Sequence, residues 1–220
     1  MSITEKLREI RDNIPPHVEL VAVSKNHTVE AISEAYQAGQ RAFGENKAQE
    51  LADKAPLLPT DIEWHFIGHL QRNKVRLVVP YVSLIHSVDS LKLLEEINAQ
   101  AEKAGRIIPC LLQFHIAEEE SKFGLDINEA HHLLDSQTYR TMKNIRISGL
   151  MGMATFTEDM SQVRREFENL HAVFQSLRED YFADDKGFCE LSMGMTSDMK
   201  AAIDEGSTMV RVGTAIFGER

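Results

Sequence analysis

The sequence has few cysteines, and their small number argues against two classes of protein. Only two occur in 220 residues, Cys110 and Cys189. Cys110 lies within an apolar segment and Cys189 just before another. We therefore expect both to be buried rather than paired in a disulfide or bound to a metal. The nine histidines form no cluster with metal-ligand spacing either, so the sequence predicts neither a disulfide scaffold nor a metal site.

Runs of like charge and long apolar segments are also absent. The formal net charge is −10, and no block of five or six like charges occurs, which argues against nucleic acid and against an anionic membrane surface. Residues 1–14 carry Glu5, Glu9 and Asp12 among their apolar residues, so they resemble neither a signal peptide nor a membrane span. We expect a cytoplasmic protein with no nucleic-acid or membrane partner.

Linkers and low-complexity segments are missing as well, and 43% of the residues are hydrophobic. Short apolar segments, typical of buried strands, alternate with segments of helical periodicity. The predicted strands are residues 19–23, 41–44, 62–66, 81–87, 109–116, 145–151, 188–192 and 209–212. Strands separated by helices imply a parallel sheet covered on both faces. Eight such units favour a closed (β/α)₈ barrel, so we expect residues 1–220 to form a single domain.

One extra helix is predicted before the first strand. Ser2 and Glu5 fit a capping box, and Pro15 ends the helix. Its apolar residues recur at helical spacing: Ile3, Leu7, Ile10 and Ile14. We expect this helix to lie beside strands one and eight, in place of the last helix of a full barrel. A doubly wound open sheet is the alternative fold, but it requires a glycine-rich fingerprint after the first strand, and residues 24–27 have none.

Loops rich in Gly, Ser and Thr follow the last two predicted strands. We expect a helix after Thr196 and one short helical turn after Thr214. Helix N-termini offer free N–H groups to an anion, and Gly213 permits close backbone approach to a ligand. The hydroxyls of Thr196, Ser197 and Thr214 add donors. Barrels build phosphate sites after strands seven and eight, so the sequence predicts a phosphate ligand, with ordinary N-caps and turns as the alternative.

Three further residues at predicted strand ends can carry chemistry. Lys25 ends the first strand, and partial desolvation there would leave a neutral amine for imine formation; an amine that stays in water is the alternative. Arg211 lies on the last strand and needs an acceptor, either a carboxylate such as Asp198 or Glu190 or the ring nitrogen of a cofactor. Asn46 follows the second strand, where it either donates to a phenolate oxygen or forms a turn.

Several long segments together resemble the pyridoxal phosphate homeostasis protein family. They are Leu20-Val21-Ala22-Val23-Ser24-Lys25, Phe43-Gly44-Glu45-Asn46, Trp64-His65-Phe66-Ile67-Gly68-His69-Leu70-Gln71-Arg72-Asn73-Lys74, Leu191-Ser192-Met193-Gly194-Met195 and Met209-Val210-Arg211-Val212-Gly213-Thr214-Ala215-Ile216-Phe217-Gly218. The resemblance covers the chain from about residue 5 to residue 220, in order. Two positions differ from the family pattern: Thr196 stands where members usually have Ser, and His115 where many have Asn.

The resemblance implies a barrel like that of alanine racemase, without that enzyme's second β-domain. It also implies that pyridoxal 5′-phosphate (PLP) is bound as a Schiff base on Lys25, with Arg211 facing the pyridine nitrogen. The residues that would hold the phosphate are Thr196, Ser197, Gly213 and Thr214. An arginine cannot accept the N–H of a pyridinium, so it favours the unprotonated ring and a weaker electron sink.

Family members buffer or deliver the cofactor, so the resemblance implies a carrier without efficient turnover, with PLP-dependent apoenzymes as partners. We expect a monomer or a weak dimer. The alternatives are a PLP enzyme acting on amino acids and a barrel enzyme acting on another phosphorylated metabolite. A racemase needs an acid/base group on each face of its substrate, and His69 and His86 are better placed to supply a second one than Tyr36 or Tyr81.

Overall fold

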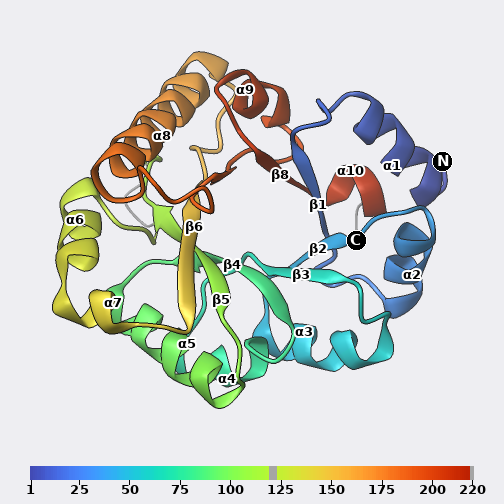
Figure 1. The fold of residues 1–220 in the computed structure, drawn as a ribbon. Coiled ribbons are helices and arrows are strands. Elements are labelled where there is room, and N and C mark those ends of the chain that lie inside the picture. The colour runs from blue at the N-terminus through green and yellow to red at the C-terminus, as the bar shows by residue number, and fades with distance from the viewer. Residues whose placement is uncertain (119–122, 219–220) are drawn as a thin grey trace.

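Eight parallel strands close into a barrel in the computed structural model, which describes residues 1–118 and 123–218. The strands are β1 (Glu19–Val23), β2 (Ala42–Glu45), β3 (Glu63–Phe66), β4 (Val82–Val88), β5 (Ile108–Phe114), β6 (Ile145–Gly152), β7 (Glu190–Ser192) and β8 (Met209–Val212). Each strand pairs with the next, and β8 pairs with β1 (Figure 1). The predicted (β/α)₈ barrel is therefore confirmed, and the doubly wound sheet is excluded.

Helices surround the barrel on the outside (Figure 1). They are α1 (Ile3–Asp12), α2 (Val29–Gln37), α3 (Ala48–Lys54), α4 (Val75–Val78), α5 (Leu91–Lys103), α6 (Ile127–Asp135), α7 (Gln137–Thr141), α8 (Met160–Tyr181), α9 (Met199–Asp204) and α10 (Thr214–Phe217), with 3₁₀ turns η1 (Ala55–Leu57) and η2 (Arg72–Lys74). Within the described residues no helix is both long and apolar enough to cross a membrane.

Helix α1 occupies the place expected for it. The predicted capping box is present, with the Ser2 hydroxyl accepting from the Glu5 N–H and the Glu5 carboxylate accepting from the Ser2 N–H. Its buried residue, Leu7, is 1% exposed. Arg11 donates to the carbonyl of Ala38 at the end of α2, 3.1 Å away. Helix α1 thus lies against α2, which follows β1, and against α10, which follows β8 (Figure 1).

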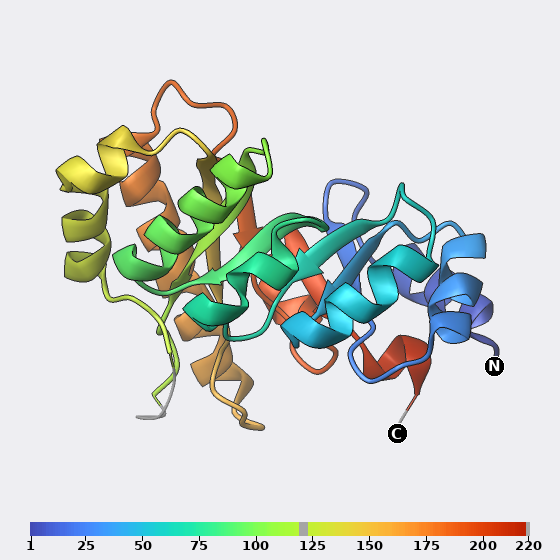
Figure 2. The same ribbon diagram turned by 90° about the horizontal axis from the view of Figure 1, so that it is seen from below.

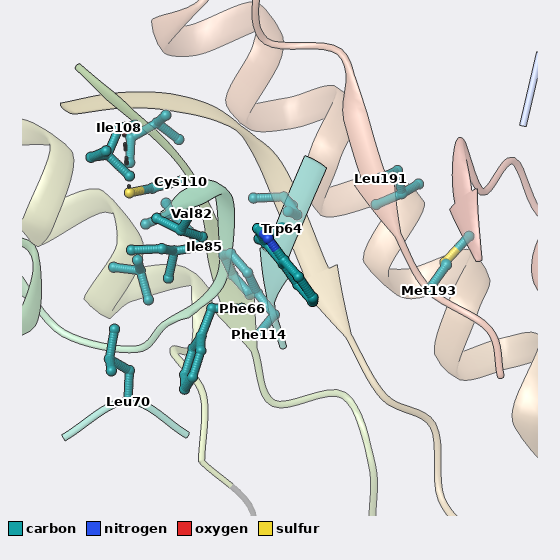
Figure 3. Packing of buried hydrophobic residues seen from close by; sticks show 14 of the residues in the cluster. Trp64, Phe66, Leu70, Val82, Ile85, Ile108, Cys110, Phe114, Leu191 and Met193 are labelled. Atoms are coloured by element: carbon teal, nitrogen blue, oxygen red, sulfur yellow. Dashed lines mark hydrogen bonds between the residues drawn. The ribbon is translucent and has the colours of Figure 1, made fainter. Parts of the chain in front are cut away.

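The two faces of the strands pack against different partners. The outer layer lies between strands and helices and is a continuous apolar cluster that includes Phe43, Trp64, Phe66 and Phe167. Figure 3 shows part of it, with Trp64 and Phe66 from β3 among the labelled side chains. A second cluster contains strand residues only and fills the inside of the barrel; its six members, here called the interior ring, are Val21, Ala42, Leu84, Leu111, Met151 and Met209.

Some local predictions need correction. Helix α7 was not predicted, and the helix expected after Thr196 begins only at Met199. Strand β7 begins at Glu190, later than predicted. Cys110 is fully buried, as expected, but Cys189 is exposed. Cys189 lies just before β7 and lines an open cavity at the end of the barrel where strands begin, so no layer of helices covers it.

Candidate functional site

The predicted site residues all lie at the ends of strands. Lys25 follows β1, Asn46 follows β2, and Arg211 lies in β8. Thr196 and Ser197 follow β7, and Gly213 and Thr214 follow β8. The carboxyl ends of parallel barrel strands meet on one side, and Figure 2 shows α10 and the connection from β6 to α8 on the same, lower side. The structure therefore brings the predicted residues to one barrel mouth.

The turn that carries Lys25 is fixed on both sides of this residue. The ammonium group of Lys54 donates to the carbonyl of Ser24 at 2.9 Å. The N–H of Asn26 donates to the Glu50 carboxylate at 2.5 Å. Asn26 has a φ of 60°, a left-handed conformation that asparagine tolerates better than most residues. Lys25 itself is half-buried, and α3 holds the backbone on both sides of it.

A buried ion pair lies behind this turn. Glu45 is 0% exposed, and its Oε1 atom accepts from Lys54 at 2.8 Å and from the Ser24 hydroxyl at 2.6 Å. Its other oxygen, Oε2, has no hydrogen-bond partner among the described residues. Burial raises the pKa of Glu45, and the bonds from Lys54 and Ser24 oppose that rise. The pair couples α3 to the end of β1 and so positions Lys25.

Asn46 lies beside Lys25 across two neighbouring strands. Val23 pairs with Gly44, and both candidate residues lie two positions beyond that pair. The Oδ1 atom of Asn46 is buried without a partner among the described residues. A Cβ atom at Gly68 would lie 2.3 Å from the Asn46 carbonyl oxygen, so only glycine fits at that position. The close approach of Gly68 holds Asn46 at the mouth.

Arg211 is 5% exposed and points into the barrel. Its Nη1 atom donates to the carbonyl of Ser192 at 2.9 Å and to the Ser192 hydroxyl at 2.5 Å. Its Nη2 atom donates to the Gly152 carbonyl at 3.0 Å. These bonds involve three of the five guanidinium donors. Burial lowers the pKa of Arg211 to about 10, partly offset by the nearby Asp198 carboxylate.

Neither carboxylate proposed as the partner of Arg211 forms an ion pair with it in the described residues. Asp198 instead accepts from the N–H of Met195, and Glu190 accepts from the Thr208 hydroxyl. Uncharged oxygens hold the guanidinium, which leaves its charge without a direct counter-ion.

The loops after β7 and β8 present hydroxyl groups to solvent. Thr196, Ser197 and Thr214 are exposed, and none of their hydroxyls has a hydrogen-bond partner in the described parts of the chain. Gly213 is the N-cap residue of α10, and a Cβ atom there would lie 3.2 Å from the Val23 carbonyl oxygen. The close approach that glycine permits is therefore to β1, and it brings this loop to the strand that ends at Lys25.

Three buried residues are linked to Arg211 through a series of contacts; of these, His65 and Ser192 were not predicted as part of the site, and His86 was considered only as an acid/base candidate. The His65 and His86 rings lie 3.0 Å apart through Nδ1 and Nε2, and His86 Nδ1 lies 3.0 Å from the Ser192 hydroxyl. The sequence did contain one signal. His65 alternates with the outward residues Trp64 and Phe66, which places it on the inner face of β3.

The other acid/base candidates lie in different settings. Tyr36 is on α2 and donates to Asp61, on the outside of the barrel. His69 follows β3 and lies at the mouth, with its Nδ1 atom 3.3 Å from the Asp89 carboxylate and its ring stacked on Phe123.

Comparison with known proteins places this architecture. The family model of the alanine racemase N-terminal domain matches residues 1–220. The pyridoxal phosphate homeostasis protein of Pasteurella multocida is 38% identical over 233 residues, covering 100% of this chain and 98% of that protein. The protein of that name from Vibrio alginolyticus is 42% identical, covering 94% of this chain and 88% of its own.

A solved structure agrees with these relatives. PipY of Synechococcus elongatus is 38% identical, covers 99% of this chain over 100% of its own, and has a TM-score of 0.92 without PLP and 0.89 with PLP bound. The fold and its mouth thus define a barrel of the alanine racemase N-terminal class. Within that class, this chain belongs to the pyridoxal phosphate homeostasis protein family.

Proposed function

We propose that this chain binds pyridoxal 5′-phosphate and takes part in its homeostasis, by storing the cofactor and delivering it. The observation that carries this proposal is the meeting of Lys25, Arg211 and the β7 and β8 loops at one barrel mouth. PLP needs an amine for its aldehyde, a partner for its ring nitrogen and a site for its phosphate. The PLP-bound structure of the relative PipY supports the proposal.

The residues at the mouth fit the groups of this cofactor. The Lys25 amine would condense with the aldehyde, forming a C=N bond with release of one water molecule. The unpartnered hydroxyls of Thr196, Ser197 and Thr214, with the free N–H groups at the start of α10, would bind the phosphate. Asn46 would donate through its Nδ2 amide group to the phenolic oxygen.

We further propose that the protein does not turn over amino acids efficiently. Bound PLP supplies an electron-withdrawing ring, but Arg211 cannot accept a proton from its nitrogen, so the unprotonated ring is the weaker electron sink. PLP-dependent apoenzymes are the proposed recipients of the cofactor. The alternative, a racemase-like enzyme, is favoured by one observation: His69 lies within 3.3 Å of Asp89, a pair that can carry a proton at the mouth.

Residues 1–220 would then act as one PLP-binding domain, and we propose a cytoplasmic monomer or weak dimer. The single closed barrel supports the first point. Sedimentation of the purified protein over a range of concentrations tests the second, and a tight dimer at nanomolar concentration would contradict it.

Borohydride trapping tests the link to the cofactor. Reduction of the PLP-loaded protein followed by peptide mapping should place the pyridoxyl group on Lys25, and Lys25→Ala should lose the visible absorption band. Lys47→Ala is a matched control, because Lys47 also lies at the mouth side, just after β2, and should keep the band. A label on Lys47 or Lys74 instead would contradict the assignment of Lys25 as the lysine that forms the Schiff base.

Amino-acid turnover separates the carrier from the enzyme. The loaded protein is incubated with L- and D-amino acids in deuterated water, and α-deuterium exchange and chiral composition are followed. We expect slow or no exchange. Rates of about 1 s⁻¹ or faster, typical of working enzymes, would favour the racemase-like alternative, and their loss in His69→Asn would identify the second base.

A further inference from the structure

A chain of hydrogen-bonded polar side chains crosses the inside of the barrel. His65 of β3 contacts His86 of β4 at 3.0 Å, His86 contacts Ser192 of β7 at 3.0 Å, and Ser192 contacts Arg211 of β8 at 2.5 Å. These four side chains, here called the polar column, are each 5% exposed or less. Four strands contribute one residue each, so the contacts exist only because the barrel closes.

Arginine fixes the direction of every hydrogen bond in the polar column. A guanidinium has donors only, so the Ser192 oxygen accepts from Arg211. The hydroxyl proton of Ser192 must then point to its other partner, the Nδ1 atom of His86. The reverse arrangement, with His86 donating, would leave that hydroxyl proton without an acceptor among the described residues, which is costly in a buried site.

The same logic assigns both imidazole tautomers. Because Nδ1 of His86 accepts, the proton of the neutral ring is on Nε2, and it is donated to Nδ1 of His65. The proton of His65 is therefore on its own Nε2 atom. Burial favours neutral rings: it lowers the pKa of His65 to about 4 and that of His86 well below its usual value, and the positive charge of Arg211 lowers the pKa of His86 further.

The His65 end of the polar column reaches the side of the barrel opposite the mouth. One nitrogen of His65 and one carboxylate oxygen from each of Glu19 and Glu63 lie within 4.8 Å of one another. These residues line a cavity of about 240 Å³ that Glu190 also lines. His65 thus lies close to two carboxylates at the end of the barrel where the strands begin.

We propose that His86, acting through Ser192, is a positioning residue for Arg211, and that His65 and His86 are both held as neutral Nε2–H tautomers. The polar column then presents only uncharged acceptors to the guanidinium. The polar column aligns Arg211 from inside the barrel without a counter-charge, and the positive charge of Arg211 remains available at the mouth. The consequence for a bound ring nitrogen rests on the proposed function; the tautomers and the alignment do not.

The tautomers are measured by NMR on the protein labelled with ¹⁵N at histidine, without added cofactor. Two-bond ¹H–¹⁵N spectra distinguish Nε2–H, Nδ1–H and imidazolium rings, and His65→Gln and His86→Gln assign the signals. We expect Nε2–H for both rings from pH 5.5 to 8. An Nδ1–H tautomer or an imidazolium at either residue in that range would overturn the proposal, whether or not the protein binds PLP.

Two serines provide a matched comparison. Ser192 and Ser87 are both 0% exposed, but the Ser87 hydroxyl has no hydrogen-bond partner in the described residues. Ser192→Ala should shift the His86 nitrogen signals, and Ser87→Ala should leave them unchanged. Equal responses in the two variants would contradict the assigned direction of the hydrogen bonds in the polar column.

The positioning role is read from bound PLP. Ser192→Ala and His86→Leu should shift the visible band of the cofactor and weaken its binding about two- to tenfold, the effect of one hydrogen bond. His86→Gln, which keeps a donor and an acceptor, should restore part of both, and Ser87→Ala should match the parent protein. An unshifted band in Ser192→Ala, with PLP still bound through Lys25, would refute the positioning role and leave the proposed function intact.

Discussion

The outer layer and the inside of the barrel are built from the same strands but differ in composition. The outer layer joins strands to helices through a continuous set of aromatic and aliphatic side chains. The inside combines the six apolar residues of the interior ring with the polar column and the residues of the mouth. Apolar burial in the outer layer stabilises the fold without fixing any chemistry, which frees the inside to hold buried polar groups in defined orientations.

The difference also explains how a buried arginine and two buried histidines are tolerated. Polar groups are costly inside a protein unless they are hydrogen-bonded, and each member of the polar column has partners at 2.5–3.0 Å. The only charged side chain in the polar column is Arg211, at the end nearest the mouth. The comparison therefore predicts that outer-layer changes alter stability alone, whereas changes inside alter binding.

The largest expected effect is the loss of an aromatic ring from the outer layer. Phe167 of α8 is 0% exposed, so Phe167→Ala should lower the free energy of unfolding by about 3–5 kcal/mol. PLP affinity of the folded protein should not change. Phe156→Ala is the control, because Phe156 is 88% exposed and a surface change usually costs less than about 0.5 kcal/mol. Urea unfolding measures the stability of both variants. A loss of PLP affinity in folded Phe167→Ala would show that the outer layer also affects binding, contrary to the comparison.

Next in size is the ion pair at the boundary of the two regions. Lys54→Met leaves the fully buried Glu45 without its cation and should cost about 3 kcal/mol. It also removes the bond to the Ser24 carbonyl, so the turn at Lys25 should loosen and PLP binding should weaken. The double variant Glu45→Met/Lys54→Met should recover most of the stability but not the binding. A double variant as unstable as Lys54→Met would show that packing, not charge, dominates here.

The hydroxyls at the mouth should affect binding and leave stability unchanged. Hydrogen bonds to a charged acceptor are worth about 1.5–3 kcal/mol each, so losing two of them in Thr196→Ala/Thr214→Ala should weaken PLP binding by about two to four powers of ten. Both residues are exposed, and the urea midpoint should stay constant. Pyridoxal, which lacks the phosphate, should bind the parent protein and the variant equally weakly; a phosphate-independent affinity would contradict the phosphate site.

Arg211→Glu tests the charge at the end of the polar column nearest the mouth. The variant supplies the acceptor that a pyridinium needs, so the band of bound PLP and its pH response should change, while Lys25 still forms the link. An unchanged spectrum would show that Arg211 does not face the ring.

The smallest expected effect is at the end of the barrel opposite the mouth, where the strands begin. Burial, with Glu190 and Glu63 nearby, raises the pKa of Glu19 from 4.5 to about 7. The folded state therefore binds a proton more tightly than the unfolded state, and this residue makes stability fall as pH rises from 4.5 to 7. Glu19→Gln should raise stability at pH 8 by about 1 kcal/mol, reduced by solvent screening, and change little at pH 4. The reverse pH dependence would contradict the raised pKa.

Local sequence patterns were sufficient to predict the strands and to place the candidate site residues at strand ends. Alternation and apolar segments identified all eight strands, with errors of one or two residues at most ends, and the strand ends marked Lys25, Asn46 and Arg211. Helix α7 was missed because five residues are too few for a clear helical period. The start of α9 at Met199 was missed because the turn from Thr196 to Asp198 uses its polar residues outside the helix.

The partners of those residues were decided by tertiary structure. His86 and Ser192 are 106 residues apart, and the register of β4 shifts against both of its neighbours, between Trp64 and His65 on one side and between Ile85 and Val88 on the other. Alternation tells which face of a strand a side chain is on, but not its height relative to side chains of other strands. The sequence by itself placed Arg211 on the last strand, beside the loop predicted to bind phosphate; barrel closure decided that Ser192 and the Gly152 carbonyl, and not a carboxylate, accept its hydrogen bonds.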